Sequence, residues 1–218
     1  LEFRRVLFRP SLSVVHDQIL GEVTIPLFGA SAEQPLRTER FQAWLRPRVD
    51  ILVVVDDSPT MQEEQPRLLG ASGAFILQLV DEADIDFHIG VTNMDLGPTG
   101  ALGALRGTHP VLTRDTPNVS HEFSSNLRVG TGGSEFEEGL EAARLALSSD
   151  VNAGFRRPEA ALWLLFLSDE DDASARPVDT YARFFESLVQ DRGPLGLYIT
   201  SVSSDPLAPC PQSTAPGY

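Results

Sequence analysis

The sequence contains no lysine and a single cysteine, Cys210. Without lysine the chain has no residue for a Schiff base, for a P-loop phosphate contact, or for the lysine that steadies a transferring phosphoryl group. One cysteine cannot form a disulfide within the chain or a multi-cysteine zinc site. The longest apolar run, residues 160–167, is far shorter than the roughly 20 residues that cross a bilayer. These absences exclude several enzyme classes and predict that no segment of this chain spans a membrane.

Positive charge is also scarce, because 17 arginines stand against 31 acidic residues and give a net charge of −14. A nucleic-acid-binding surface needs positive charge to replace phosphate counterions, so we expect no nucleic-acid partner. With 218 residues and a hydrophobic fraction of 42%, the chain is large and apolar enough to bury a core. The acidic excess fits either simple solubility or a divalent cation.

The first 48 residues differ in character from the rest. Residues 1–12 carry three arginines and resemble translated cloning sequence, so we expect this lead to be non-native. Residues 13–30 contain two short β-like runs and are interpreted as the end of an upstream β domain, since Ile-Pro-Leu-Phe-Gly resembles the last strand of an immunoglobulin-like module. Residues 31–48 are polar, contain two prolines and are expected to form a linker to a domain of residues 49–218.

From residue 49 onward, strand-like and helix-like segments alternate. The segments 50–55, apolar after Asp50, and 160–167, apolar throughout, are typical of strands buried on both faces of a parallel sheet. Periodicity predicts further strands at 86–92, near Val111 and at 195–202, and helices at 61–79, 134–147 and 178–190. This order predicts an α/β fold, doubly wound, with a mostly parallel central sheet, one hairpin, and helices on both faces.

Hydroxyl and carboxylate side chains follow both buried strands. Asp56, Ser58 and Thr60 come directly after the first, at alternate positions that let an extended turn point all three at one place. Asp169 follows the second, and Ser134 opens the predicted helix between them. Ligands bind to such sheets at the carboxyl ends of the central strands. Hard oxygen ligands from three loops that converge there predict a site for a magnesium-like cation.

These motifs resemble the metal-ion-dependent adhesion site of von Willebrand factor A domains over about residues 49–203. That family has Asp-x-Ser-x-Ser after its first buried strand, a Thr on a second loop and an Asp after its fourth strand. The matching metal ligands are Asp56, Ser58, Thr60, Ser134 and Asp169, with Thr131 and Asp171 as alternates. The phrases Val-Asp-Ile-Leu and Leu-Ser-Asp-Glu-Asp-Asp are similar to the bacterial branch of the family.

The resemblance implies a binding module that is not an enzyme. It would hold Mg²⁺, or else Mn²⁺ or Ca²⁺, with Asp56, Ser58, Thr60 and Ser134 close to the ion and Asp169 reaching it through water. A protein partner would complete the coordination with an acidic side chain, in adhesion or assembly at a cell surface, in the periplasm or outside the cell. The family continues with another strand and helix, so the chain is expected to be incomplete at its C-terminal end.

Two structural interpretations compete with a cation site. Thr60 with Glu63, and Ser134 with Glu137, each fit the capping box, in which a hydroxyl and a glutamate satisfy backbone N–H groups at a helix start. The second interpretation is a structural module that binds no metal. Its acidic side chains would serve only to keep the protein soluble.

An enzyme class is a further alternative. Haloacid-dehalogenase-like phosphatases carry Asp-x-Asp-x-Thr after a buried strand, and residues 56–60 differ from this pattern at one position. That position is Ser58, where the acid/base Asp would stand, and the phosphate-steadying lysine has no counterpart in the chain.

Overall fold

The computed structural model describes residues 19–25, 37–43, 46–98, 100–148, 150–190 and 196–202. The chain divides into two compact units, Leu1–Pro47 and Arg48–Tyr218. In the first unit, β1 (Ile19–Ile25) pairs with β2 (Arg37–Ala43) in an antiparallel two-stranded sheet. The segment expected to be a linker therefore contains a strand. The lead of residues 1–12 lies outside the described residues.

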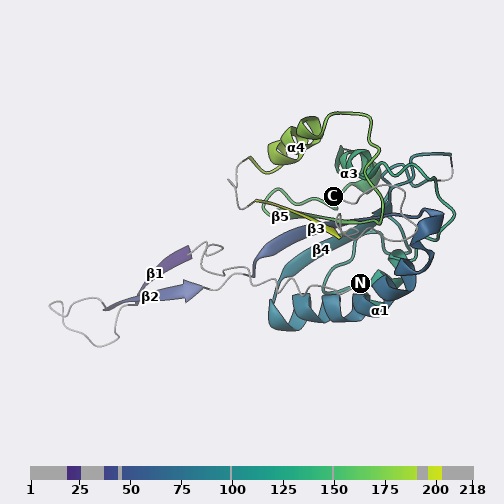
Figure 1. The fold of residues 1–218 in the computed structure, drawn as a ribbon. Helices are drawn as coiled ribbons and strands as arrows, with labels where there is room; N and C mark the ends of the chain where they lie inside the picture. The colour runs from purple at the N-terminus through teal and green to yellow at the C-terminus, as the bar shows by residue number, and fades with distance from the viewer. Residues whose placement is uncertain are drawn as a thin grey trace, which may run out of the picture. The chain divides into compact units, whose positions relative to one another are not determined.

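The second unit is built on a four-stranded sheet in the order β4-β3-β5-β6, with every pair parallel (Figure 1). Its strands are β3 (Arg48–Val55), β4 (Asp86–Asn93), β5 (Ala161–Leu167) and β6 (Leu197–Val202). The uninterrupted apolar runs of β3 and β5 explain their central places, where both faces of a strand are covered. The chain adds β4 on one side of β3 and then returns to add β5 on the other, so the topological switch point lies between β3 and β5.

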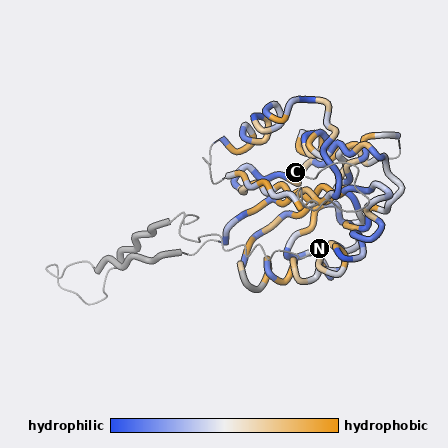
Figure 2. Tube along the Cα trace, in the orientation of Figure 1, coloured by the Kyte–Doolittle hydropathy of each residue, from blue (hydrophilic) through white to orange (hydrophobic). Residues whose placement is uncertain are grey.

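Helices cover both faces of this sheet. Their bounds are α1 (Glu64–Leu77), α2 (Val119–Asn126), α3 (Gly139–Ser148) and α4 (Val178–Ser187). On β3, Ile51 and Val53 pack towards α1 and α2, whereas Leu52 and Val54 pack towards α3 and α4. Figure 2 shows the hydrophobic residues concentrated along the strands between these two layers. The predicted doubly wound α/β fold with helices on both faces is confirmed.

Some local expectations are wrong. The strand near Val111 is reduced to one antiparallel bridge, between Ile89 and Leu112, so the predicted hairpin is not formed and the described sheet is wholly parallel. The helix expected from residue 134 begins at Gly139. Among the described residues, the unit also contains the short helical segments η1 (Pro59–Gln62), η2 (Gln78–Glu82) and η3 (Asp150–Asn152).

Two expectations are left open by the described part of the chain. Cys210 and the proposed loss of a last strand and helix concern residues after Val202, outside the described ranges. Within those ranges, no helix combines the length and the apolar character that a membrane crossing requires.

Candidate metal centre

Asp56 lies at the switch point, fully buried and held by groups from both central strands. Its backbone N–H donates to the carbonyl of Leu167 at 2.9 Å. One carboxylate oxygen, Oδ1, accepts the backbone N–H of Ser58 at 2.8 Å, and the other, Oδ2, accepts the hydroxyl of Ser168 at 2.5 Å. These bonds fix the Asp56 carboxylate between the ends of β3 and β5.

Two hydroxyls continue from Asp56 towards the loop that follows β5. The Ser58 and Thr60 hydroxyl oxygens lie 2.7 Å apart, and Thr60 lies within hydrogen-bond distance of Asp169 Oδ1 at 3.1 Å and Glu170 Oε1 at 3.2 Å. Pro59 separates the two hydroxyls and starts η1, a position that suits its fixed φ and its lack of an N–H. The structure thus brings Asp56, Ser58, Thr60 and Asp169 into one network.

The spacing of these oxygens fits a hard divalent cation. Two ligands on adjacent corners of a Mg²⁺ octahedron lie about 3 Å apart, because each is about 2.1 Å from the ion. The distance of 2.7 Å between the Ser58 and Thr60 hydroxyl oxygens is close to this spacing, and Asp169 lies one hydrogen bond further on, 3.1 Å from Thr60. Among the described residues, no group of three or more His, Cys, Asp or Glu side chains makes a metal site by itself.

The electrostatics of the network also favour a cation. Burial raises the pKa of the Asp169 and Glu170 carboxyls, and the negative charge of Asp56 raises both further. Burial likewise raises the pKa of Asp57, with Asp95 and Asp56 adding to the shift. A positive ion among these carboxylates would replace mutual repulsion by attraction.

Ser134 does not join this network. Its hydroxyl accepts the backbone N–H of Phe136 at 2.9 Å. Its loop is nevertheless anchored beside the network, because the N–H of Gly133 donates to the carbonyl of Asp57 at 2.8 Å. Ser134 lines a separate open pocket of about 420 Å³, whose other lining residues are Asp95, Leu96, Gly97, Phe136, Glu138 and Ala173.

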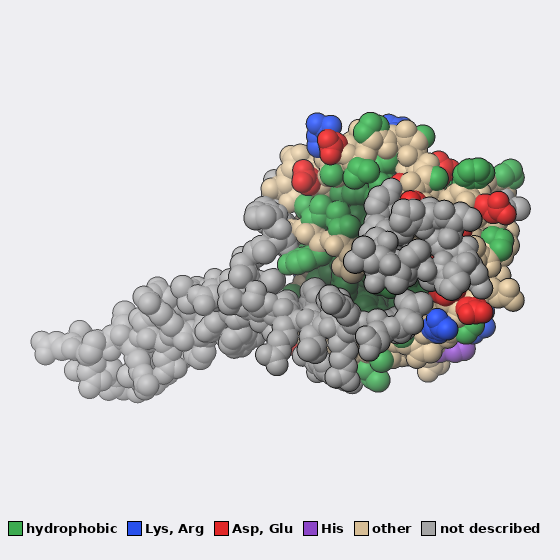
Figure 3. All heavy atoms as spheres, viewed as in Figure 1, with side chains coloured by type: hydrophobic (Ala, Val, Ile, Leu, Met, Phe, Trp, Pro, Cys, Tyr) green, Lys and Arg blue, Asp and Glu red, His purple; other side chains and the backbone are tan. Residues whose placement is uncertain are grey.

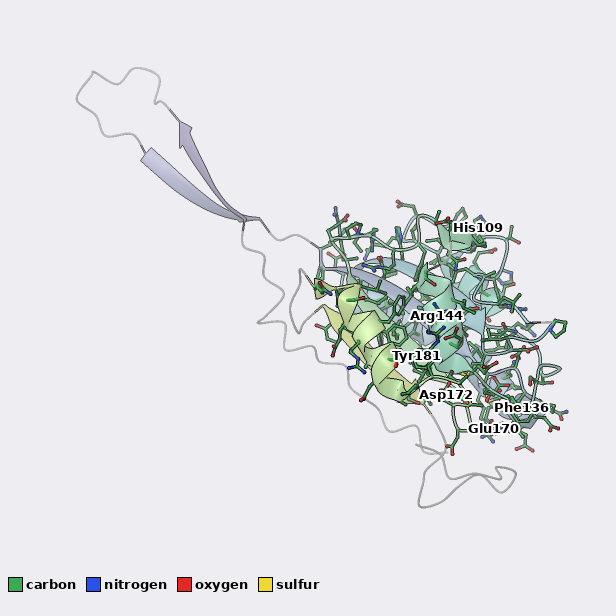
Figure 4. The ribbon with its side chains drawn as sticks, turned by 90° about the horizontal axis from the view of Figure 1, so that it is seen from above. His109, Phe136, Arg144, Glu170, Asp172 and Tyr181 are labelled. Carbon is green, nitrogen blue, oxygen red and sulfur yellow. The ribbon has the colours of Figure 1, made fainter. Side chains whose placement is uncertain are left out.

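The two alternates lie on the same loops as the residues they would replace. Thr131 is half-buried on the loop of Ser134. Asp171 is half-buried on the loop of Asp169, and its Oδ1 is buried with no hydrogen-bond partner among the described residues. Figure 4 shows Glu170 from one of these loops and Phe136 from the other at the same end of the unit.

The capping-box interpretation of the two hydroxyls is wrong. Neither η1 nor α1 has a side-chain hydrogen bond at its N-cap. Helix α3 begins five residues after Ser134, and its free N–H groups on Leu140 and Glu141 donate instead to Asp172 Oδ1 and Ser174 Oγ, both at 3.0 Å. The loop after β5 therefore caps α3 as well as carrying Asp169.

Sequence reasoning missed several polar residues around the site. Ser168 and Glu170 flank Asp169, and Asn93 at the end of β4 donates to Asp57 Oδ2 at 2.6 Å. The same rule that selects residues at the carboxyl ends of parallel strands selects Asn93. Glu137 is almost completely buried, and burial together with the surrounding carboxylates, Asp56 first among them, raises its pKa to about 9.

No protein-family model and no curated protein matches the sequence. Solved structures do match it. Proximal thread matrix protein 1 from the mussel byssus is 16% identical with a TM-score of 0.44, over 72% of this chain and 38% of that one. A further structure of that mussel protein, with a TM-score of 0.42, is described as having a zinc-occupied MIDAS motif. The pilus adhesin SpaC of Lactobacillus rhamnosus GG is 11% identical with a TM-score of 0.49, over 75% of this chain and 25% of that one. The chain thus spans well under half the length of each.

Proposed function

We propose that the chain is a divalent-cation-dependent protein-binding module and not an enzyme. In this proposal Asp56, Ser58 and Thr60 lie close to the ion, and Asp169 contacts it through water. Ser134 joins them only when its hydroxyl leaves the backbone N–H of Phe136 and turns to the ion. The observation that carries the proposal is the row of hydroxyl and carboxylate oxygens at 2.7 and 3.1 Å, placed at the switch point between β3 and β5. When Mg²⁺ or Mn²⁺ is bound, it supplies a positive charge that the protein oxygens only partly neutralise.

The partner in this proposal is a protein with an exposed acidic side chain. Magnesium binds through few protein ligands and keeps exchangeable waters, so one position of its shell is available to a carboxylate from outside. Such bridging suits adhesion or assembly by a bacterial protein at the cell surface, in the periplasm or in the medium. With a net charge of −14 the chain repels an acidic partner. A bound cation between the two surfaces would offset that repulsion.

Titration with Mn²⁺ tests the proposal. We expect saturable binding to the wild-type chain, loss of that binding in Asp56→Ala, and unchanged affinity in Asp115→Ala, where the altered carboxylate is exposed and outside the network. Crystals soaked in Mn²⁺ should show one anomalous peak between Asp56 and Thr60. Equal affinity in wild type and Asp56→Ala would refute the proposal.

The phosphatase alternative has its own assay. In the structure the Ser58 hydroxyl, at the position of the acid/base Asp, is engaged with Thr60. We expect no turnover of an aryl phosphate in the presence of Mg²⁺. If the wild-type chain turns over the substrate and Asp56→Asn abolishes that turnover, the chain is an enzyme and the binding-module proposal is wrong.

A further inference from the structure

Glu137 is a buried carboxyl group with no counter-charge among the described residues. It is 1% exposed, and both carboxylate oxygens lack a hydrogen-bond partner among the described residues. Burying an ionised carboxylate alone costs several kcal/mol, so buried charges are normally paired or bound to metal. A carboxyl group buried in this way is neutralised either by a proton, in keeping with its raised pKa, or by a positive partner, and a cation bound nearby would be such a partner.

The backbone around Glu137 holds it at the candidate metal centre. The Glu137 carbonyl accepts the N–H of Ala173, on the loop after β5, at 2.7 Å. The next N–H, of Glu138, donates to the carbonyl of Met94, just after β4, at 3.3 Å. Glu137 is therefore fixed between two of the loops that follow the parallel strands.

Carboxylates of neighbouring loops lie close enough to Glu137 to act on its charge. The charges that act on it come, in order of size, from Asp56, Asp57, Glu170 and Asp95, which lie on three different loops at this edge of the sheet. Asp57 also has a buried oxygen, Oδ1, without a hydrogen-bond partner in the part of the chain that the structure describes. Three orphaned carboxylate oxygens, on Glu137 and Asp57, thus accompany the network of Asp56.

We infer that Glu137 contributes a further carboxylate to the cation site of Asp56, an inference that rests on the proposed function. The cation is the positive partner that the buried side chain lacks. An added carboxylate raises the negative charge count of the site, and in oxygen-ligand sites that count sets the affinity for a divalent ion. Glu137 is thus a determinant of how tightly the module holds its ion.

The experiment compares Mn²⁺ affinity in Glu137→Gln with wild type and with Glu138→Gln, a neighbour that undergoes the same chemical change and lines the separate pocket. We expect Glu137→Gln to weaken Mn²⁺ binding at least tenfold, on the scale seen for groups around metal ligands. Glu138→Gln should stay within twofold of wild type. In EDTA, the melting temperature of Glu137→Gln should equal or exceed that of wild type, because the variant removes a buried unpaired carboxylate.

The outcomes separate the two proposals. Wild-type Mn²⁺ affinity in Glu137→Gln, together with loss of binding in Asp56→Ala, would overturn the role of Glu137 and leave the metal centre standing. Unchanged binding in Asp56→Ala would overturn the metal centre itself. If Glu137→Gln fails to fold, Glu137→Asp keeps the charge and retracts it by one methylene group. That variant should fold and still bind Mn²⁺ more weakly than wild type, and equal affinity would refute the inference.

Discussion

Asp56 has its hydrogen-bond donors in place before any ion binds. The Ser58 N–H and the Ser168 hydroxyl occupy its two oxygens, and the bond of its own N–H to Leu167 locks the backbone to β5. Side chains already held in position lose little conformational freedom when a ligand arrives. In the proposed metal centre, the residues around Asp56 would therefore hold it ready for the ion.

Ser168→Ala should lower the stability of the ion-free protein. The variant leaves Asp56 Oδ2 buried without its donor, which costs about 1–3 kcal/mol. Urea unfolding in EDTA measures this loss, and Ser148→Ala is the matched control because its hydroxyl is exposed at the end of α3. A change in Ser168→Ala no larger than about 0.5 kcal/mol, the range of ordinary surface substitutions, would contradict the prediction.

Gly133→Ala should disturb the loop of Ser134, because an added Cβ would lie 2.6 Å from Asp57 Cγ and 2.8 Å from both carboxylate oxygens. Overpacking of this kind costs about 1–3 kcal/mol, and we expect Mn²⁺ affinity to fall with it. Gly132→Ala is the control, since nothing lies within 4 Å of a Cβ there. Thermal melts and Mn²⁺ titration of the pair measure both effects, and identical behaviour of the two variants would show that the close approach at Gly133 has no consequence.

At the scale of elements, the buried strands were predictable because their residues carry the signal themselves. The apolar runs of β3 and β5 are short, contain β-branched or aromatic residues and are flanked by polar residues, as buried strands are. In the structure Thr60, after β3, and Asp169, after β5, lie within hydrogen-bond distance. Helix α2 was not predicted, because its sequence, Val-Ser-His-Glu-Phe-Ser-Ser-Asn, is largely polar and packs through few buried side chains. Its position depends on long-range packing, with Phe123 stacked on Phe75 of α1.

The start of α3 shows a second limit of local signals. Ser134 and Glu137 have the spacing of a capping box, yet the groups that cap α3 are Asp172 and Ser174, more than 30 residues further along the chain. A cap supplied by another loop leaves no mark in the sequence around the helix. For the same reason the burial of Glu137 could not be read from its neighbours.

Helices α3 and α4 are joined by a charged cluster with a defined pH dependence. Two hydrogen bonds from Arg144, at 2.9 and 2.7 Å, are the main cause of the lowered pKa of Glu141, and Tyr181 and Arg176 lower it further. Figure 4 shows Arg144 and Tyr181 close to one another between the two helices. Because the folded state holds Glu141 ionised below its usual pKa of 4.5, its contribution to stability is present above that value and is lost as the pH falls through the lower one.

Glu141→Gln should therefore destabilise the protein at pH 7 by about 1 kcal/mol, the scale of a well-formed ion pair near the surface. The difference from wild type should shrink as the pH falls below 4.5. Urea unfolding at a series of pH values measures it. Exposed Glu186→Gln on α4 is the control, expected to differ little from wild type. A Glu141→Gln deficit that stays constant down to acid pH would contradict the assignment.

At the scale of the whole molecule, acidic charge is spread widely and also collected at one edge of the sheet. Figure 3 shows acidic side chains at several places on the visible face, in keeping with the excess of 31 acidic over 17 basic residues. The acidic charge collected at the sheet edge is that of four buried carboxylates, Asp56, Asp57, Glu137 and Asp169. An experiment with cations must therefore distinguish their general attraction to the acidic surface from binding at the proposed metal centre.

Mn²⁺ or Mg²⁺ should raise the melting temperature of the wild-type chain. A ligand at 100 times its Kd stabilises the folded state by about 2.7 kcal/mol, which corresponds to a rise of about 5–10 °C for a chain of this size. Asp56→Ala keeps most of the surface charge, so it should show only the small shift due to general screening. Scanning calorimetry with and without EDTA measures both, and equal shifts in the two proteins would assign the effect to the surface.

The direction of β3 has a mechanical consequence. The preceding chain joins this strand at Arg48, and Asp56 follows its other end, so eight residues at about 3.3 Å each place the two points about 26 Å apart. A partner gripped through the ion would pull along β3 against whatever tethers Arg48. Parallel neighbours pair with β3 on both sides, from Val49 to Val55. Tension would therefore load both ladders in shear, with many bonds resisting at once, which is the geometry suited to a contact that must hold under force.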